Sequence, residues 1–528
     1  MIDDDSSLDA VGAWLAGLPR SFNIASHILA PSQERADTKT AVSDHNGAYT
    51  FGELRALTDQ AAAALLEMGL EPEDRMVMVM ADTVMFPIIF LGAIKAQIVP
   101  VPLNPLLSRE DFSYIIADSR AKAVIAGEKD ADTIRSALGD NPRVKFFEVD
   151  RGLDNSGIGE RILRSGKLET PPATVADEVA FWLYSSGSTG RAKGVRHLHR
   201  NVLVTIECFA RKVLGLGPED KVFSAAKLFF AYGLGNGLTF PFSVGAQTSY
   251  LLDRPTPDSV IDWILRERPT VFCGVPTLFG SLLANRRAKE LAQAGLRICT
   301  SAGEALPNEI GRRFEDLTGA PIIDGLGSTE MLHIFLSNRP GEIRYGSTGK
   351  PVPGYLAKLL EDDGSEIVEA GRIGELVVSG FSGAEGYWNQ RDKSLRTFRG
   401  HWTHTGDKYL RDDDGFYYYA GRADDMMKVS GNWVSPFEVE SALISHPAIL
   451  EAAVVPGRDD AGLVKPKAYV VLRDGYTASP DLERELQHHV KGSLAPWKYP
   501  RWISFCDELP KTATGKIQRF KLRDSDGL

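Results

Sequence analysis

The segment with the greatest potential for chemistry is Tyr184-Ser185-Ser186-Gly187-Ser188-Thr189-Gly190-Arg191-Ala192-Lys193-Gly194, which follows the apolar run Val179–Leu183. Its glycines let backbone N–H groups turn toward an anion, and its hydroxyls and one lysine add donors and positive charge. It is neither G-x-x-x-x-G-K-[ST], because Ala192 takes the place of the second glycine, nor G-x-G-x-x-G. A surface loop without function seldom combines these features behind an apolar strand. We therefore predict a phosphate-binding loop with contacts from Ser185, Ser186, Ser188, Thr189 and Lys193.

Alternating helical and apolar segments must position this loop. A helical pattern through Leu54 and Leu65 precedes an apolar strand at Met76–Met80 and a second helix at Phe86–Ala96. Further apolar strands are predicted at Ala123–Ala126, Val222–Ala225, Val271–Gly274 and Leu296–Thr300. This order is typical of an α/β fold, in which ligands gather where strands end.

The pattern changes in the last third of the chain. After about Gly341, Ile373–Ser379 and Phe416–Ala420 read as strands bounded by Gly, Asp and Asn, which predicts a smaller β-rich unit. From Gly421 onward the sequence predicts an α+β order that is long enough for a separate domain. Its predicted elements are helices at Val439–Ile444 and Leu482–Leu494 and strands at Ala452–Val455, Ala468–Leu472 and Trp502–Phe505.

Composition narrows the class of partner. The 528 residues include 60 Lys+Arg and 70 Asp+Glu, a formal net charge of −10, and no basic run, which disfavours nucleic acids and anionic membranes. The start of the chain is acidic and its most apolar stretch, Met85–Ile94, is too short to span a bilayer, so we expect a cytoplasmic protein. Four scattered cysteines predict reduced thiols rather than disulfides or a zinc site.

The phosphate-loop segment resembles the signature of the adenylate-forming superfamily, which includes acyl- and aryl-CoA ligases, luciferases and peptide-synthetase adenylation domains. Four later segments fit the same family in order: Gly325-Leu326-Gly327-Ser328-Thr329-Glu330, Thr405-Gly406-Asp407, Gly421-Arg422-Ala423-Asp424-Asp425 and Pro510-Lys511-Thr512-Ala513-Thr514-Gly515-Lys516. The resemblance implies a large N-terminal body of α/β subdomains with a small β-rich subdomain, residues 1–420. A hinge at 421–424 and a small mobile α+β domain, 425–528, would follow.

The same resemblance implies roles for individual residues. Lys516 would contact both the substrate carboxylate and the α-phosphate of ATP, where two anions must meet and charge must be neutralised. Glu330 would hold Mg²⁺, Thr329 would bond an α-phosphate oxygen, and Asp407 and Arg422 would bind the ribose. The remaining nucleotide contacts implied are Gly303, Glu304, Ala305, Asp324, Gly325 and Gly327.

Family members perform two half-reactions by rotating the C-terminal domain, here about Asp424. The first pose would present Lys516, and the second would bring Lys428 and Gly431 to the acyl group, where Gly431 leaves room for the pantetheine of CoA. On the residues alone, Gly431 can equally be a turn glycine and Asp424-Asp425 a solvated acidic pair. In the loop, Arg191-Ala192 stand before Lys193 where many relatives have Lys-Pro or a similar pair.

Three runs look much like benzoate–CoA ligases in particular: Phe229–Gly237, Thr300–Pro307 and Ser328–Asn338. A flat aryl ring fits a slot between small backbone surfaces and an aromatic wall. We expect this slot to be lined by Phe230, Ala231, Tyr232, Ala302, Gly303, Gly327, His333 and Ile334. Phe230 would form the gate where several relatives have histidine, and His333 would either line the pocket or cap a buried network.

The sequence therefore predicts an ATP-dependent aryl-CoA ligase that forms aryl-CoA, AMP and diphosphate. Its substrates would be ATP, CoA and benzoate or a hydroxy- or aminobenzoate, with Mg²⁺ as cofactor, in a monomer or homodimer. Two alternatives remain at this point: an enzyme that loads an aryl acid onto a carrier protein, and an adenylate-forming oxidase of the luciferase type.

Overall fold

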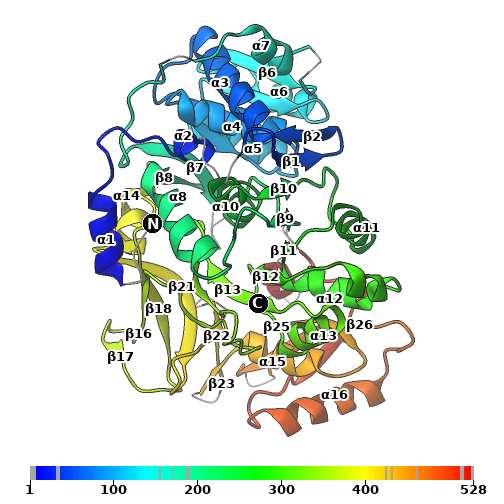
Figure 1. Ribbon diagram of the computed structural model, residues 1–528. Coiled ribbons are helices and arrows are strands. Elements are labelled where there is room, and N and C mark those ends of the chain that lie inside the picture. Colours follow the sequence, from blue (N-terminus) through cyan, green and yellow to red (C-terminus); the bar gives the residue numbers. More distant parts are fainter. Residues whose placement is uncertain are drawn as a thin grey trace.

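The computed structural model of the chain describes residues 7–30, 36–153, 156–168, 170–185, 191–422, 425–429, 432–459, 462–511 and 517–524. In Figure 1 helices α3 to α7 (blue and cyan) lie above the green strands of a central sheet. The β-rich segments (yellow) and the C-terminal segments (orange and red) lie below that sheet.

The first sheet is parallel, with strand order β4-β3-β5-β6. Its strands are β3 (Arg75–Val79), β4 (Val99–Pro102), β5 (Ala123–Gly127) and β6 (Phe146–Asp150). Helices in and before this part are α1 (Leu8–Ala16), α2 (Ile24–Leu29), α3 (Phe51–Glu67), α4 (Met85–Lys95), α5 (Arg109–Asp118), α6 (Ala131–Leu138) and α7 (Ile158–Arg164). The central strands are buried along nearly their whole length, as helix-covered parallel strands are. The predicted helix–strand–helix order is confirmed here.

The central sheet has nine strands in the order β15-β14-β13-β12-β11-β9-β10-β1-β2. They are β1 (Thr40–Asp44), β2 (Gly47–Thr50), β9 (Lys221–Ser224), β10 (Gln247–Ser249), β11 (Val271–Gly274), β12 (Ile298–Ala302), β13 (Ile322–Gly327), β14 (Ile334–Ser337) and β15 (Lys350–Pro351). The strand expected at Leu296–Thr300 lies two residues later, because β12 pairs with β11 from Ile298 to Ser301 and with β13 as far as Ala302. This pairing brings the carboxyl ends of β9, β11, β12 and β13 to one edge.

Helical segments accompany the central sheet. They are α8 (His199–Thr205), α9 (Ala231–Leu234), α10 (Phe240–Val244), α11 (Pro257–Glu267), α12 (Pro276–Ala284) and α13 (Asn308–Thr318), with π-helical turns η1 (Ile206–Arg211) and η2 (Gly235–Thr239) and a 3₁₀ turn η3 (Ala288–Gln293). Prolines at the first helical position begin α11 and α12, and Thr256 closes a capping box with Ser259 at the start of α11. The π-helical turn η2 directly follows α9, the helix that carries two predicted aryl-slot residues. Such π-helical turns are frequent at functional sites.

Two antiparallel sheets complete the N-terminal part. One is small, with order β19-β8-β7, and consists of β7 (Val179–Ser185), β8 (Lys193–Leu198) and β19 (Gly386–Tyr387). The other is the predicted β-rich unit, formed by β16 (Leu356–Leu360), β17 (Glu366–Ile367), β18 (Ile373–Ser379), β20 (Phe398–Arg399), β21 (Trp402–Arg411) and β22 (Tyr417–Arg422). Helix α14 (Arg391–Thr397) connects β19 to β20.

The C-terminal segment has its own buried cluster, which includes Val439, Leu443, Val454 and Leu486. Its elements are β23 (Met427–Val429), β24 (Asn432–Val434), α15 (Pro436–Ile444), β25 (Ile449–Arg458), β26 (Val464–Leu472), α16 (Pro480–Ser493), β27 (Trp502–Phe505) and α17 (Arg519–Asp524). The two helices and three strands expected after Gly421 are all present, and α15 and β25 extend further than predicted.

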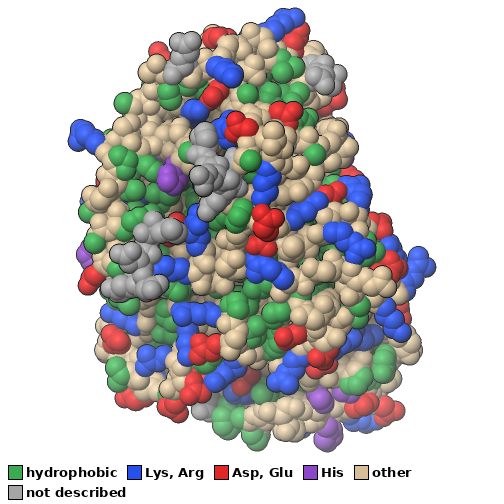
Figure 2. Space-filling view, in the orientation of Figure 1, with side chains coloured by type: hydrophobic (Ala, Val, Ile, Leu, Met, Phe, Trp, Pro, Cys, Tyr) green, Lys and Arg blue, Asp and Glu red, His purple; other side chains and the backbone are tan. Residues whose placement is uncertain are grey.

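Surface and thiol chemistry agree with the composition. Lys and Arg side chains are interspersed with Asp and Glu over the face that Figure 2 shows. All four cysteines are free thiols, three of them buried. Among the described helices, none is long and apolar enough to cross a membrane.

Candidate functional site

A hydrogen-bonded group forms where the phosphate loop leaves β7 and enters β8. Ser185 and Lys193 lie opposite each other in the β7–β8 pair. Glu330, in the turn after β13, accepts a hydrogen bond from the Tyr387 hydroxyl at 2.8 Å through Oε1, and one from Ser185 Oγ at 3.4 Å. Lys193 Nζ donates to the Tyr387 oxygen at 3.2 Å and lies 3.8 Å from Glu330 Oε1. Side chains from separate strands and turns thus surround one carboxylate.

The electrostatics of this group follow from its partial burial. Burial lowers the pKa of Lys193, and Glu330 opposes that effect, while Lys393 and Arg422 add to it. Burial and the negative charge of Glu330 raise the pKa of the Tyr387 hydroxyl. This hydroxyl therefore stays protonated and can donate a hydrogen bond to the carboxylate. The neutral Tyr387 hydroxyl therefore lies between Lys193, from which it accepts a hydrogen bond, and Glu330, to which it donates one.

The predicted ribose-binding pair lies on neighbouring strands. Asp407 on β21 and Arg422 on β22 are direct register partners, and Arg422 Nη1 donates to Asp407 Oδ1 at 3.1 Å. The Thr405 hydroxyl accepts from the Asp407 backbone N–H at 3.1 Å, which fixes the turn before it. Asp407 is buried and Arg422 is partly exposed, so the pair presents one carboxylate edge and one guanidinium.

The predicted adenine segment spans the ends of β12 and β13. Gly303, Glu304 and Ala305 follow β12 directly, and Gly303 has a φ of +97°, a conformation that favours glycine. Asp324 in β13 is buried, and the backbone N–H of Leu306 donates to its Oδ2 at 3.5 Å. Burial raises the pKa of Asp324 to about 8, although hydrogen bonds from Ser301, Leu306 and Gly325 act in the opposite direction.

One of the predicted aryl-slot residues, His333, lies in a cluster of aromatic rings. Its ring lies stacked on Tyr232, with centroids 5.6 Å apart, and contacts Phe240 edge-on at 4.6 Å and Phe209 at 5.1 Å. The Tyr232 hydroxyl is hydrogen-bonded to the Thr300 hydroxyl on β12. Burial lowers the pKa of His333 to about 3, so its imidazole is neutral at physiological pH.

Close backbone approach holds this arrangement together. A Cβ on Gly235 would lie 2.4 Å from His333 Cδ2, so only glycine allows η2 to meet that ring. Gly327 and Ile334 are register partners in β13 and β14, and Ala302 pairs with Gly325. Ala231 begins α9, Phe230 caps it, and the Phe230 ring meets that of Phe229 at 4.6 Å.

Several predicted residues fall outside the described part of the chain. These are Ser186, Ser188, Thr189, Asp424, Gly431 and Lys516. The backbone of Lys428 lies in β23, but its side chain is not described. Thr329, in contrast, lies in the turn next to Glu330, where the backbone carbonyl of Thr329 accepts from Leu332 N at 3.1 Å. The predicted aryl-slot residues are thus described, whereas three of the predicted phosphate-loop contacts and the predicted C-terminal catalytic residues, apart from the Lys428 backbone, are not.

The donor set around Glu330 is suited to Mg²⁺. Among the described residues, no group of three or more His, Cys, Asp or Glu side chains is close enough to hold a metal by itself. Mg²⁺ usually keeps several waters and is bound by one or two carboxylates together with substrate phosphates. One partly buried carboxylate beside a phosphate loop fits that pattern.

Sequence reasoning missed three residues of the site. Tyr387 lies beside Lys193 because β19 pairs with β8, and its hydroxyl also reaches Glu330 in the turn after β13. Phe209 and Phe240 form two walls around His333 from η1 and α10. The sequence feature that comes nearest to indicating these walls is Gly235-Asn236-Gly237, the π-helical segment that follows Tyr232. Its glycines allow the backbone to lie close to neighbouring side chains.

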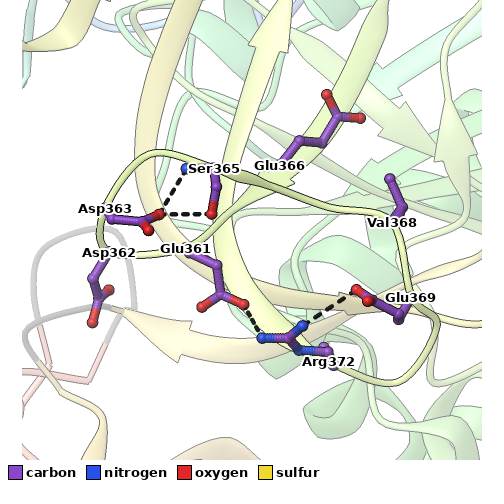
Figure 3. Close-up of a pocket in the computed structure, with 8 residues that line it drawn as sticks. All are labelled: Glu361, Asp362, Asp363, Ser365, Glu366, Val368, Glu369 and Arg372. Atoms are coloured by element: carbon purple, nitrogen blue, oxygen red, sulfur yellow. Dashed lines mark hydrogen bonds and ion pairs between the residues drawn. The ribbon is translucent and has the colours of Figure 1, made fainter.

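A hollow of about 560 Å³ lies elsewhere, on the β16–β17–β18 turns, and is lined by Glu361, Asp362, Asp363, Ser365, Glu366, Val368, Glu369 and Arg372 (Figure 3). Arg372 bridges Glu361 and Glu369, and Asp363 accepts from Ser365, so these five polar side chains already bond one another. An acidic lining repels phosphates and carboxylates, so we do not assign it to the nucleotide or to an aryl acid.

Comparisons with known proteins find relatives that match nearly the whole chain. A benzoate–CoA ligase of Thauera aromatica is 48% identical over 510 residues, which cover 96% of this chain and 97% of that one. The crystal structure of a benzoate CoA ligase from Burkholderia xenovorans LB400 superposes with a TM-score of 0.90 at 48% identity, covering 95% of this chain and 100% of that one. The anthranilate CoA ligase AuaEII in complex with anthranoyl-AMP gives a TM-score of 0.93 at 38% identity, covering 97% and 98%.

Family models match both parts of the chain. The model of the AMP-binding enzyme matches residues 30–388, and the model of the AMP-binding enzyme C-terminal domain matches residues 438–516. The first match contains the phosphate loop, the Glu330 turn and Tyr387, and the second ends at Lys516. With the adenylate-forming fold and both matches in place, this chain belongs to the AMP-binding enzyme family.

Proposed function

We propose that this protein is an ATP-dependent aryl-CoA ligase of the benzoate–CoA ligase type. The observation that carries the proposal is the ring cluster around His333, built from Tyr232, Phe209 and Phe240, in a chain that resembles benzoate–CoA ligases over nearly its whole length. A flat apolar acid matches a site of this chemistry, whereas a long acyl chain would need an extended tunnel.

In the first half-reaction, a carboxylate oxygen of the aryl acid attacks the α-phosphorus of ATP, and diphosphate leaves. Lys193 and the loop hydroxyls would hold the phosphates, and Asp407 and Arg422 would bind the ribose. Lys516 would neutralise the two anions as they meet. The described contacts support the first two roles, because Lys193 lies at the start of β8 beside Glu330, and Asp407 is paired with Arg422.

Mg²⁺ would be held by Glu330 and by ATP phosphate oxygens, and when bound it supplies positive charge to the phosphates. Tyr387 keeps the Glu330 carboxylate oriented by donating its proton to Oε1. The Ala384 N–H donates to the Glu330 backbone carbonyl at 2.8 Å and fixes the same residue from the other side.

In the second half-reaction, the CoA sulfur attacks the carbonyl carbon of the aryl adenylate. The C–S bond forms, the thiol proton is lost, and AMP leaves with the former carboxylate oxygen. We propose that residues 425–528 rotate about Asp424 between the two half-reactions, from a pose with Lys516 at the phosphates to one with Gly431 at the acyl group. The support for this division is the separate buried cluster of the C-terminal segment.

The substrate we propose is benzoate or a small hydroxy- or aminobenzoate, and His333 is the residue that could bond a ring substituent. Burial removes its charge, so it offers one donor and one acceptor rather than a cation. An apolar slot separates such acids only weakly, whereas a site that hydrogen-bonds an OH or NH₂ rejects the analogue without it strongly.

The test is turnover with benzoate, ATP, Mg²⁺ and free CoA. We expect benzoyl-CoA, AMP and diphosphate. A panel of benzoate, 2-, 3- and 4-hydroxybenzoate, 2-aminobenzoate, cyclohexanecarboxylate and a medium-chain fatty acid, ranked by kcat/KM, then defines the ring substituents. Formation of ADP, or no turnover with any aryl acid, would contradict the proposal. Adenylate formation without release by free CoA would indicate a carrier-protein ligase instead.

A further inference from the structure

Asp82 is a buried carboxylate that belongs to none of the predicted site motifs. It follows β3 of the four-stranded sheet and is only 3% exposed. Its partners are not on that sheet. Oδ1 accepts from the backbone N–H of Leu228 at 3.2 Å, and Oδ2 lies 3.8 Å from Lys227 Nζ. One carboxylate thus joins the N-terminal sheet to the turn that follows β9 of the central sheet.

Lys227 is held from several sides. Its ammonium also donates to the backbone carbonyls of Leu251 and Leu252, which follow β10. Its side chain is 17% exposed, and that of Asp82 is 4% exposed. Burial raises the pKa of Asp82 to about 6, and Lys227 and the Leu228 N–H both act to lower it. The ionised carboxylate therefore depends on these two partners.

The turn fixed in this way contacts the aryl site directly. The Phe230 N–H donates to the Lys227 carbonyl at 3.1 Å, and the Leu234 N–H donates to the Phe230 carbonyl at 2.7 Å. A Cβ on Gly233 would lie 2.1 Å from the Lys227 carbonyl oxygen, so α9 rests on the backbone of the turn. A shift of the turn must therefore move α9.

Helix α9 carries Ala231 and Tyr232 toward His333. Tyr232 is stacked on the His333 ring and bonded to Thr300, so its position sets one wall of the ring cluster. We propose that Asp82 is a positioning residue for the aryl-acid site, which it holds in place through Lys227, Leu228 and α9. This inference rests on the proposed aryl-CoA ligase function. It adds a residue that does not contact the acid and acts through the turn that supports α9.

Asp44 supplies a matched control. It is also a buried carboxylate, 6% exposed, and it accepts from the Val84 N–H at 2.9 Å, two residues from Asp82. Its other described backbone contact is with Asn46 N–H at 2.7 Å. Asp44, at the end of β1, is therefore also a buried carboxylate that accepts a backbone hydrogen bond, here from the residue before α4. Among the described contacts, none joins it to Lys227 or Leu228.

The experiment compares Asp82→Asn, Lys227→Met and Asp44→Asn by diphosphate release in the full-length enzyme, with thermal unfolding measured alongside. The amide introduced by Asp82→Asn would keep an acceptor for Leu228 and lose the charge that faces Lys227. We expect the KM for benzoate to rise about tenfold or more in the first two variants, because small displacements of reacting groups cost large factors in rate and binding. The KM for ATP should change by less than about twofold, since the phosphate contacts are unaltered.

Asp44→Asn should leave the benzoate KM near that of the wild type at a similar loss of thermal stability. An equal benzoate shift in Asp44→Asn, or an unchanged benzoate KM in Asp82→Asn, would overturn the positioning role. If Asp82→Asn does not fold, Lys227→Met decides the question by the same two KM values. Wild-type protein that forms no aryl adenylate would refute the proposed function itself, and this result is distinct from either outcome in the variants.

Discussion

The Tyr387 hydroxyl donates a hydrogen bond to Glu330 Oε1 at 2.8 Å, which links β19 to the turn after β13. The same hydroxyl oxygen accepts from Lys193 Nζ at 3.2 Å. A single hydroxyl therefore sets the distance between the predicted Mg²⁺-binding carboxylate and the predicted phosphate-binding lysine. Its loss would leave these two charges free to pair directly.

The variant Tyr387→Phe should lower kcat/KM for adenylate formation by about tenfold to a hundredfold, the range for a lost hydrogen bond to a charged group. The concentration of Mg²⁺ needed for half-maximal rate should rise, because the Glu330 carboxylate is no longer held. Diphosphate release at varied Mg²⁺ measures both effects.

Tyr345→Phe is the matched control for this prediction. The Tyr345 hydroxyl also donates to a carboxylate at 2.8 Å, but its acceptor is Glu315 on α13, which does not belong to the hydrogen-bonded group around Glu330. The prediction fails if both variants reduce the rate equally, since the loss would then come from general destabilisation.

The contrast between Tyr387 and Asp407 shows what sequence reasoning can reach. Asp407 and Arg422 belong to motifs with recognisable spacing, and the structure pairs them in register on β21 and β22. Tyr387 lies 194 positions from Lys193, and only the pairing of β19 with β8 brings them together. Motif order therefore predicted the residues that lie within motifs, and not the one supplied by long-range strand pairing.

The bounds of the strands show the same difference between what local sequence predicts and what long-range pairing decides. Strands at Val271–Gly274 and Ile373–Ser379 have the predicted bounds, because short apolar runs between glycines and polar residues mark them clearly. The end of β12 at Ala302 depends on hydrogen bonds to β13, which local propensity does not contain. The walls of Phe209 and Phe240 around His333 depend in the same way on how η1 and α10 pack.

Gly235→Ala should damage the aryl site selectively. The backbone of Gly235 has a φ of −61°, which alanine adopts readily, so the change tests space rather than conformation. Its new Cβ would lie 2.4 Å from His333 Cδ2 and push the ring away from Tyr232. We expect the KM for benzoate to rise about tenfold or more, with the KM for ATP nearly unchanged.

Gly280→Ala provides the comparison for that prediction. Gly280 lies in α12, where a Cβ would meet only the end of the Ile310 side chain, at 3.2 Å. It should leave both KM values near those of the wild type. Equal behaviour of the two alanine variants, measured with benzoate and ATP in the same assay, would count against a crowded His333 ring.

The two half-reactions should separate in variants of the C-terminal segment. Lys516→Ala should abolish adenylate formation and still convert synthetic benzoyl-adenylate and CoA to the thioester, because the charge it removes is needed only where the carboxylate meets the α-phosphate. Gly431→Leu should do the reverse, because its side chain would fill the path proposed for pantetheine. Each step is followed separately, by diphosphate release and by thioester formation. Equal failure of both variants at both steps would show that the two-pose assignment is wrong.

The pH dependence of stability should reveal the buried carboxyl of Asp324. Burial raises its folded pKa to about 8, from an ordinary value of 3.8 in the absence of the fold. Between these values the folded state binds more protons than the unfolded state, so stability falls as pH rises. The loss approaches about 1.4 kcal/mol per pH unit within that window and ends above the folded pKa.

Asp324→Asn cannot titrate and should lack this loss, so the wild type should become less stable relative to the variant from about pH 5 to about pH 8. Asp220→Asn should show the opposite trend. Burial favours its neutral form, but hydrogen bonds from Arg297, Thr270 and Gly217 outweigh that effect and lower its pKa. The carboxylate of Asp220 therefore stabilises the fold above its unfolded pKa, and this contribution disappears as pH falls through the lower, folded value. Denaturant unfolding of all three proteins, measured from below the ordinary aspartate pKa of 3.8 up to about pH 8, distinguishes the two carboxylates, because Asp220 acts at the acidic end and Asp324 above it. Parallel curves for wild type and Asp324→Asn between about pH 5 and about pH 8 would show that Asp324 is ionised throughout.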